Sequence, residues 1–277
     1  PALALRVAHH LMLAHGHAVG VVRRNVPDAK VGIVLILVPV DAASESAADR
    51  DAARAMDGQF NRWFLDPLYR GAYPVDAIED RVRWGHLDST TLPFVQPGDL
   101  EVIATPTDFL GVNYYSRAVM EAGPDGRPRG VPQAPPEDLT AMGWEVHPQG
   151  LATILTRVTR EYAPREIHIT ENGSAFEDVV EPSGRIADTR RLEYLRDHLR
   201  MAAHSIAQGV PLAGYFAWSL LDNWEWAKGY GPRFGLVRVD YATQQRTLKD
   251  SAYLYRAVIA GHAVPDGPVP LSAGGRS

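Results

Sequence analysis

Apolar positions along the chain follow two different spacings, and each spacing predicts a different kind of element. Residues 30–40, KVGIVLILVPV, form a continuous run rich in β-branched side chains, which predicts a strand buried on both faces. Shorter runs predict further strands at 107–116, 166–170 and 212–221. Helical spacing predicts helices over 2–15, 47–64, 148–162, 188–209 and about 250–260. The strict alternation of strand and helix predicts an α/β fold with parallel strands and crossover helices.

Long irregular segments follow the carboxyl ends of the last three predicted strands. They cover residues 117–147, 172–187 and 222–233 and contain much of the proline and glycine. Long loops in a compact domain are usually functional, and in α/β barrels the site lies at this end of the strands. Four strands are too few to close an eight-stranded barrel, so an isolated chain would have two unpaired sheet edges.

Composition excludes several classes of protein. The chain has 28 basic and 33 acidic residues in 277, a net charge of −5, and therefore neither a basic surface for nucleic acid nor a polybasic membrane patch. It has no run of 18 apolar residues to cross a membrane. The absence of cysteine excludes disulfides and thiolate metal sites and fits a reducing compartment, so we expect a cytoplasmic protein. The chain starts at Pro1 without methionine, and we expect it to be a piece of a longer protein.

Polar and aromatic side chains gather at the ends of the predicted strands. Carboxylates, a tyrosine and several tryptophans suit a sugar, because indole faces stack on pyranose C–H groups and carboxylates accept bonds from hydroxyls. Glu171, at the end of IHITE, either caps the following Asn-Gly turn or acts as a nucleophile; a nearby tyrosine hydroxyl would orient it. The residues concerned are Asn113, Tyr115, Glu171, Trp218, Glu225 and Trp226.

Four longer motifs make the pattern specific. FNRWFLDPLYRGAYP, FLGVNYYS, ITENG and AWSLLDNWEWAKGYGPRFGLVRVDY resemble family 1 glycoside hydrolases, the β-glucosidase family, in order and spacing. The resemblance runs from Pro1 to about Gly261. It implies a (β/α)8 barrel and a retaining mechanism with two glutamates, and it implies no metal or organic cofactor.

The resemblance also implies roles for individual residues. Glu171 matches the nucleophile of the TENG motif, Tyr115 the tyrosine bonded to it, and Asn113 a neighbouring site asparagine. Trp218 matches the sugar platform, Glu225 and Trp226 the pair that binds the far hydroxyls, and Phe234 the aromatic residue that closes that end. The family's 6-phospho-glycosidases have serine at the Glu225 position and a downstream Lys and Tyr where this chain has Pro232 and Phe234. A neutral hexose is therefore favoured.

Two departures from the family pattern limit this assignment. No NEP motif, which contains the family's acid/base glutamate, occurs in the chain, and LRVAHHLMLAHG matches the helix that follows that motif. A family asparagine in the GIVLNLTP pattern is absent, and Ile36 and Val38 occupy those places in GIVLILVP. The second departure either alters the leaving-group side of the site or tightens packing.

The combined prediction is the C-terminal half of a (β/α)8 barrel, about strands five to eight, as a single partial domain over 1–277 with 262–277 as a flexible tail. It would hydrolyse a β-linked glucoside or similar neutral sugar when completed by an N-terminal barrel half, and would be inactive alone. The alternative is a non-catalytic carbohydrate-binding or scaffold half-barrel that self-associates. His9, His10, His15 and His17 lack an HExxH arrangement and a nearby carboxylate, so we expect a solvated helix there.

Overall fold

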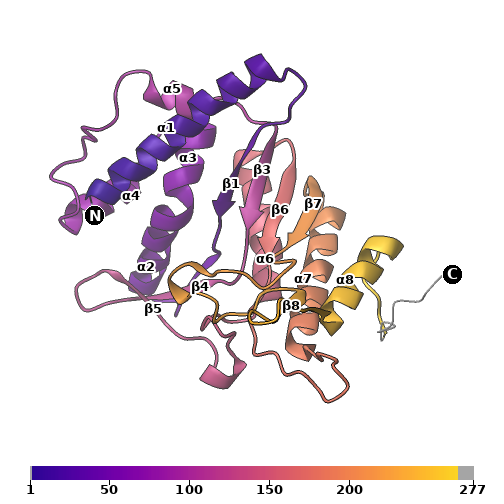
Figure 1. Ribbon diagram of the computed structural model, residues 1–277. Coiled ribbons are helices and arrows are strands. Elements are labelled where there is room, and N and C mark those ends of the chain that lie inside the picture. The colour runs from indigo at the N-terminus through magenta and orange to yellow at the C-terminus, as the bar shows by residue number, and fades with distance from the viewer. Residues whose placement is uncertain (1, 268–277) are drawn as a thin grey trace.

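The fold is built around one parallel sheet with helices packed on it. This computed structural model describes residues 2–267, so most of the predicted tail, residues 268–277, lies outside the described residues. The central sheet has the order β1-β3-β6-β7, all parallel, with bounds Gly32–Ile36, Phe109–Asn113, Ile167–Asn172 and Leu212–Ala217. In Figure 1 these strands point the same way, toward β4, β5 and β8.

Helices alternate with these strands along the chain. The longer ones are α1 (Ala2–Asn25), α2 (Ala47–Asp57), α3 (Trp63–Arg70), α6 (Pro148–Tyr162), α7 (Thr189–Ala207) and α8 (Asp250–Gly261). Shorter elements that the pattern did not predict are α4 (Val75–Arg83), α5 (Asp99–Ile103), β2 (Val40–Ala42), β4 (Ala118–Ala122), β5 (Pro128–Gly130), β8 (Val237–Val239) and β9 (Arg246–Leu248). The predicted α/β alternation is therefore present, with smaller sheets added beyond the ends of the main strands.

The main core lies between the sheet and its helices. Alternate residues of the inner strands, such as Leu110, Val112, Ile167 and Ile169, have no exposed surface and pack with the apolar faces of α1, α3 and α6. The helix predicted at 2–15 continues to Asn25. Gly16 lies inside the helix and serves packing: a Cβ there would lie 2.1 Å from the carbonyl oxygen of Val102, so glycine permits the close contact with α5.

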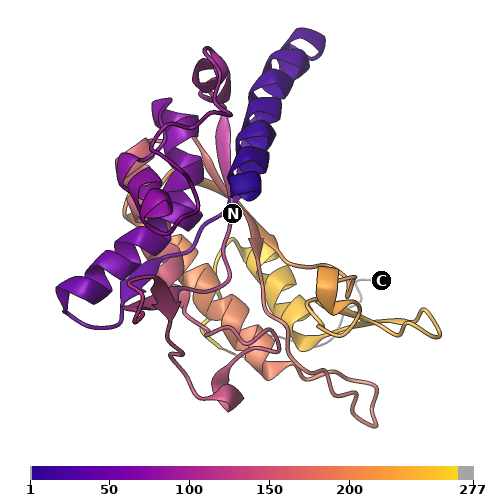
Figure 2. The ribbon, with the colours of Figure 1, turned by 90° about the vertical axis from the view of Figure 1, so that its left-hand side faces the viewer.

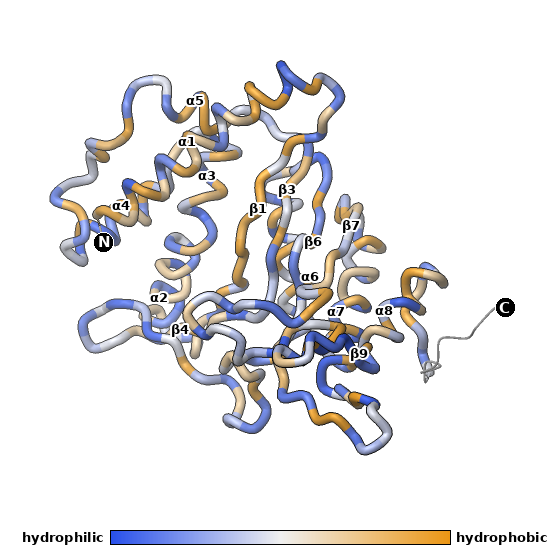
Figure 3. Tube along the Cα trace, viewed as in Figure 1, coloured by the Kyte–Doolittle hydropathy of each residue, from blue (hydrophilic) through white to orange (hydrophobic). Residues whose placement is uncertain are grey.

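The strand predicted at 30–40 differs from expectation in two ways. Only residues 32–36 form a strand, β1, since β2 starts at the last predicted residue, Val40, and belongs to another sheet; β1 is also not buried on both faces. Leu35 is buried against the helices, whereas Val34 and Ile36 on the other face are 47% and 57% exposed. The reason is that the helices cover only the face of β1 that bears Ile33 and Leu35. In addition, β1 lies at the edge of the described sheet, where it pairs only with β3. Figure 3 shows β1 as a hydrophobic stretch at this edge.

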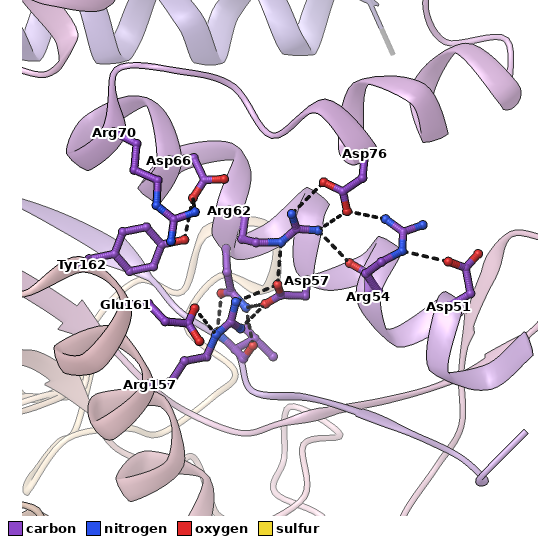
Figure 4. Close-up of polar contacts among 12 residues, drawn as sticks. Asp51, Arg54, Asp57, Arg62, Asp66, Arg70, Asp76, Arg157, Glu161 and Tyr162 are labelled. Carbon is purple, nitrogen blue, oxygen red and sulfur yellow. Dashed lines mark hydrogen bonds and ion pairs between the residues drawn. The ribbon is translucent and has the colours of Figure 1, made fainter. Parts of the chain in front are cut away.

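A π-helical turn, Gly58–Arg62, joins α2 to α3, where the sequence predicted one helix over 47–64. Ion pairs hold this turn in place (Figure 4). Asp57 accepts from Arg62 at 3.0 Å and from Arg157 of α6 at 2.9 Å, and Arg62 also reaches Asp76 of α4 at 2.7 Å. Within the turn, buried Asn61 pairs with both main-chain groups of Val38, at 3.0 and 2.7 Å. The network thereby fixes the chain after β1 next to the ends of the strands.

Candidate active site

The carboxyl ends of β3, β6 and β7 border a cavity of about 590 Å³. One part of its wall is polar and aromatic and comes from these strand ends and the loop after β7. The other part is largely apolar and comes from the segment after β1, the π-helical turn and the loop before α6. The side chains on the wall include Ile36, Val38, Met56, Phe60, Tyr115, Arg117, Met142, Trp144, Glu171, Trp218, Glu225, Trp226, Lys228 and Phe234.

Glu171 is the second-to-last residue of strand β6, where the strand pairing is irregular. The register against β3 shifts between Val112 and Asn113, so that Asn113 pairs with Glu171. Such irregularities re-aim a side chain, and they are common beside active sites. The half-buried Glu171 carboxylate accepts a hydrogen bond from the hydroxyl of Tyr115.

Tyr115 is held in an aromatic cluster. Its ring centroid lies 5.2 Å from that of Trp144 and 6.2 Å from that of Phe234. Burial, followed by the bond to Glu171, raises the pKa of the Tyr115 hydroxyl well above its usual value. The phenol therefore remains protonated and donates to the carboxylate.

Glu225 and Trp218 form the second polar pair of the cavity. The Trp218 indole nitrogen donates to a Glu225 carboxylate oxygen at 3.2 Å. Burial raises the pKa of Glu225; the Trp218 hydrogen bond opposes this, and the nearby charge of Glu171 adds to it. Two carboxylates of the same cavity therefore have different partners: a phenol donates to Glu171 and an indole to Glu225. The Trp218–Ser219 peptide in this loop is cis.

Comparison with known proteins agrees with this geometry. The model of glycosyl hydrolase family 1 matches residues 2–264. The chain belongs to glycosyl hydrolase family 1. It is 44% identical over 266 residues to beta-glucosidase A of Thermotoga maritima, and the matched region covers 95% of this chain and 58% of that protein. Beta-glucosidase A of Acetivibrio thermocellus is 40% identical over 259 residues, covering 92% and 57%.

The fold is shared with solved members of the family. The family 1 β-glucosidase of Thermotoga maritima superposes with a TM-score of 0.86 at 43% identity, covering 96% of this chain and 58% of that one. The same enzyme in complex with castanospermine gives the same TM-score. The chain thus spans about 58% of the length of the curated relatives that it matches.

The structure brings most of the predicted family 1 site residues to one cavity. Six of the seven border it, namely Tyr115, Glu171, Trp218, Glu225, Trp226 and Phe234. Phe234 is 2% exposed and supports the wall from behind, whereas Trp226 is 83% exposed at the rim.

Asn113 is the predicted site residue that does not border the cavity. It is buried, and its side-chain oxygen accepts from the hydroxyl of Thr170 at 2.7 Å. Trp224, in the loop after β7, is exposed and packs on Tyr230 with ring centroids 5.1 Å apart.

Several wall residues were missed from the sequence. Trp144 lies in the irregular segment 117–147, where no strand or helix pattern marked it. Phe60 falls within the helix predicted over 47–64, but it lies in the π-helical turn and on the cavity wall, 46% exposed. A tryptophan within an otherwise Pro- and Gly-rich loop was the one available signal.

A buried group of charges lies beneath the loop after β7. Asp222 is 4% exposed and accepts from Lys249 at 3.1 Å, from Arg233 at 3.0 Å and from the main-chain nitrogen of Gly235 at 2.9 Å. Burial lowers the pKa of Lys249, and the neighbouring Arg191 charge lowers it further. Since Asp222 stands at the start of this loop and bonds Arg233 and Gly235 at its end, it holds in place the segment that contains Glu225 and Phe234.

Among the α1 histidines, His10 and His17 are exposed as expected, but the expectation is wrong for His9. His9 has no exposed surface, and its ring nitrogens lie 3.0 Å from the Tyr73 hydroxyl and 3.0 Å from a carboxylate oxygen of Asp99. The carboxylate partner was missed because it is 90 residues away in sequence. Among residues 2–267, no group of three or more His, Asp or Glu side chains is arranged to hold a metal ion. No helix in this described part has the length and hydropathy that crossing a membrane requires.

Proposed function

We propose that this chain provides the nucleophile of a retaining β-glucosidase-type active site, with Glu171 as that nucleophile. The observation that supports it most directly is the hydrogen bond from Tyr115 to Glu171, inside a cavity that also contains the Trp218–Glu225 pair. An oriented carboxylate at a cavity wall can attack an anomeric carbon and form a glycosyl-enzyme.

The remaining groups fit the handling of a sugar. The Trp218 indole presents an apolar face to a pyranose ring, and Glu225 accepts bonds from its hydroxyls. Attack by Glu171 breaks the glycosidic bond, and the departing oxygen takes a proton from a general acid. Water then attacks the anomeric carbon, gives its proton to the same group and releases Glu171. In retaining enzymes the two carboxyl groups lie about 5 to 5.5 Å apart. We assign the acid to a glutamate of an N-terminal barrel half, because Glu225 is bonded to the Trp218 indole.

We further propose that the chain is the C-terminal half of a (β/α)8 barrel, a single partial domain. Both edge strands, β1 and β7, lack a partner on one side within residues 2–267. Val34 and Ile36 on β1 and Phe216 on β7 are each about half exposed. Burying the exposed halves of these three side chains would contribute about 3 kcal/mol. Leu3, Val7 and Leu11 on α1 are exposed as well, and Figure 2 shows α1 standing at the edge of the molecule.

The proposed substrate is a β-linked glucoside or a similar neutral sugar. Glu225 would repel a phosphate at the end of the sugar that it contacts. Pro232 and Phe234 provide no charge there. The β-glucosidase of Thermotoga maritima, which is 43% identical, has been solved in complex with castanospermine.

The test is covalent trapping. The chain, alone and together with the N-terminal segment of its parent protein, is incubated with 2,4-dinitrophenyl 2-deoxy-2-fluoro-β-glucoside, and the labelled peptide is identified by mass spectrometry. We expect one adduct, on Glu171, and none in Glu171→Gln. With unactivated substrates the chain alone should be slower than the completed barrel by at least about 10²- to 10⁴-fold, the usual contribution of general acid catalysis. Sugar binding without any adduct, in either preparation, would instead support the carbohydrate-binding alternative.

A further inference from the structure

Asn172, the residue after Glu171, is the centre of a buried hydrogen-bond network behind the cavity. Its side chain has no exposed surface. The amide nitrogen donates to the main-chain oxygen of Tyr114 at 2.8 Å and to the hydroxyl of Tyr194 at 3.0 Å. The amide oxygen accepts from the hydroxyl of Tyr215 at 2.6 Å. Strands β3 and β7 and helix α7 thus all contact the end of the strand that contains Glu171.

The Tyr194 hydroxyl has a second contact, which reaches the other half of the pair. It donates to the main-chain oxygen of Tyr115 at 3.1 Å while it accepts from Asn172. One oxygen atom therefore bonds the residue that donates to Glu171 and the residue that follows Glu171.

The regular strand ladder does not determine this geometry by itself. The β3–β6 register shifts just before Asn113, and the β6–β7 register shifts between Ile169 and Asn172. Both irregularities lie where the strands reach the cavity. Beyond the β3–β6 shift, a main-chain hydrogen bond from the Tyr114 nitrogen to the Glu171 carbonyl oxygen, at 2.9 Å, joins the strand ends. The side-chain hydrogen bonds of Tyr194 add a second connection between the same two strand ends.

Tyr194 is itself held rigidly. Its side chain is 1% exposed, and its ring stacks on His198 with centroids 3.8 Å apart. At this depth the hydroxyl has no solvent with which to exchange its bonds, and an unmade hydrogen bond would leave buried polar groups unpaired.

We propose that Tyr194 is a positioning residue that sets the hydrogen bond between Tyr115 and Glu171. Its importance for turnover rests on the function proposed above, but its effect on the hydrogen bond does not. The group does not border the cavity and acts only through Tyr115 and Asn172.

Tyr194→Phe removes the hydroxyl and little else. Tyr162→Phe is the matched control, because Tyr162 is also a buried tyrosine with a hydrogen-bonded hydroxyl. That hydroxyl donates to the carboxylate of Asp66 at 2.6 Å. Tyr162 ends α6, just before the start of β6, and so lies at the opposite end of that strand from Glu171.

The first measurement needs no activity. A hydroxyl proton donated to a carboxylate resonates downfield of those donated to neutral acceptors, and the Tyr115 signal is assigned by its loss in Tyr115→Phe. We expect this signal to move upfield or broaden in Tyr194→Phe and to stay unchanged in Tyr162→Phe. An unchanged signal in Tyr194→Phe overturns the proposal. If Tyr194→Phe does not fold, 3-fluorotyrosine at position 194 keeps the ring and changes the strength of both hydroxyl hydrogen bonds; the Tyr115 signal is then measured in the same way, and an unchanged signal overturns the proposal.

The second measurement is the rate of trapping by the 2-fluoro glucoside. We expect Tyr194→Phe to lower this rate by about 10-fold in the wild-type background, the effect of losing about one buried hydrogen bond in the transition state. In the Tyr115→Phe background the same change should have little effect, because the two residues act as a unit. Equal losses in both backgrounds overturn the positioning role. Absence of any adduct in the wild type would refute the proposed function, while the proton signal would still decide the role of Tyr194.

Discussion

His198 should make the chain lose stability in mild acid. It lies on α7 with no exposed surface, and one ring nitrogen lies 2.7 Å from the main-chain oxygen of Tyr194. The other nitrogen, Nε2, is buried and has no hydrogen-bond partner among the described residues. Burial lowers the pKa of His198 from its usual 6.5 to about 4.

The sign follows from this lowered pKa. Above pH 6.5 the imidazole is neutral in both the folded and the unfolded chain, and its contribution to stability is fully present. As pH falls from 6.5 toward 4, only the unfolded chain binds the proton, so the free energy of unfolding falls by about 1.4 kcal/mol per pH unit. Between pH 7 and pH 4.5 the loss due to His198 amounts to about 2 kcal/mol.

Urea unfolding at a series of pH values measures this loss. His198→Phe retains an aromatic ring against Tyr194 but cannot be protonated, so its unfolding free energy should fall about 2 kcal/mol less than that of the wild type over the same interval. His204→Phe, an exposed position on the same helix, should leave the pH dependence unchanged. Parallel pH profiles for the wild type and His198→Phe would refute the reasoning.

Two further predictions concern the frame of the site. Asp222→Ala leaves Lys249 buried with one carboxylate fewer and should lower the free energy of unfolding by about 3–5 kcal/mol; a loss below about 1 kcal/mol in urea unfolding would contradict the buried pair. Gly173→Ala would place a Cβ 1.7 Å from the main-chain oxygen of Trp218, so the indole should shift and tryptophan fluorescence should respond less to added glucose. The overpacking should also cost about 1–3 kcal/mol or more, whereas Gly130→Ala, with no atom within 4 Å of its added Cβ, should be close to neutral.

Much of the fold was predictable because its signals are local. The helix predicted at 148–162 is α6 with the same bounds, since proline at its start and a regular apolar stripe define it within one segment. The helix predicted over 188–209 begins at Thr189, and Asp188 before it is of a residue type that commonly caps helices. Its side chain nevertheless makes no capping bond and instead accepts from the main-chain nitrogen and the hydroxyl of Ser251. The competing partner lies 63 residues away in sequence, so no local rule could have identified it.

The site likewise contains residues that a local motif indicated and residues that only the packing of distant segments revealed. The TENG and FLGVNYYS motifs indicated Glu171 and Tyr115, and the structure places them in contact. Trp144 on the cavity wall, and Tyr194 behind it, were not singled out, because neither belongs to a motif with a recognisable chemistry.

By itself, the sequence determined the α/β alternation, the family and the residues most suited to bind and attack a sugar, because these depend on residue type and short-range spacing. The tertiary structure alone decided that Asn113 turns to Thr170, that His9 is buried against Asp99, and that β1 has an uncovered face. It also decided that Tyr194 joins Tyr115 to the residue after Glu171. Each of these depends on which distant segments the packing brings within hydrogen-bond distance, and that information is not contained in any one stretch of the chain.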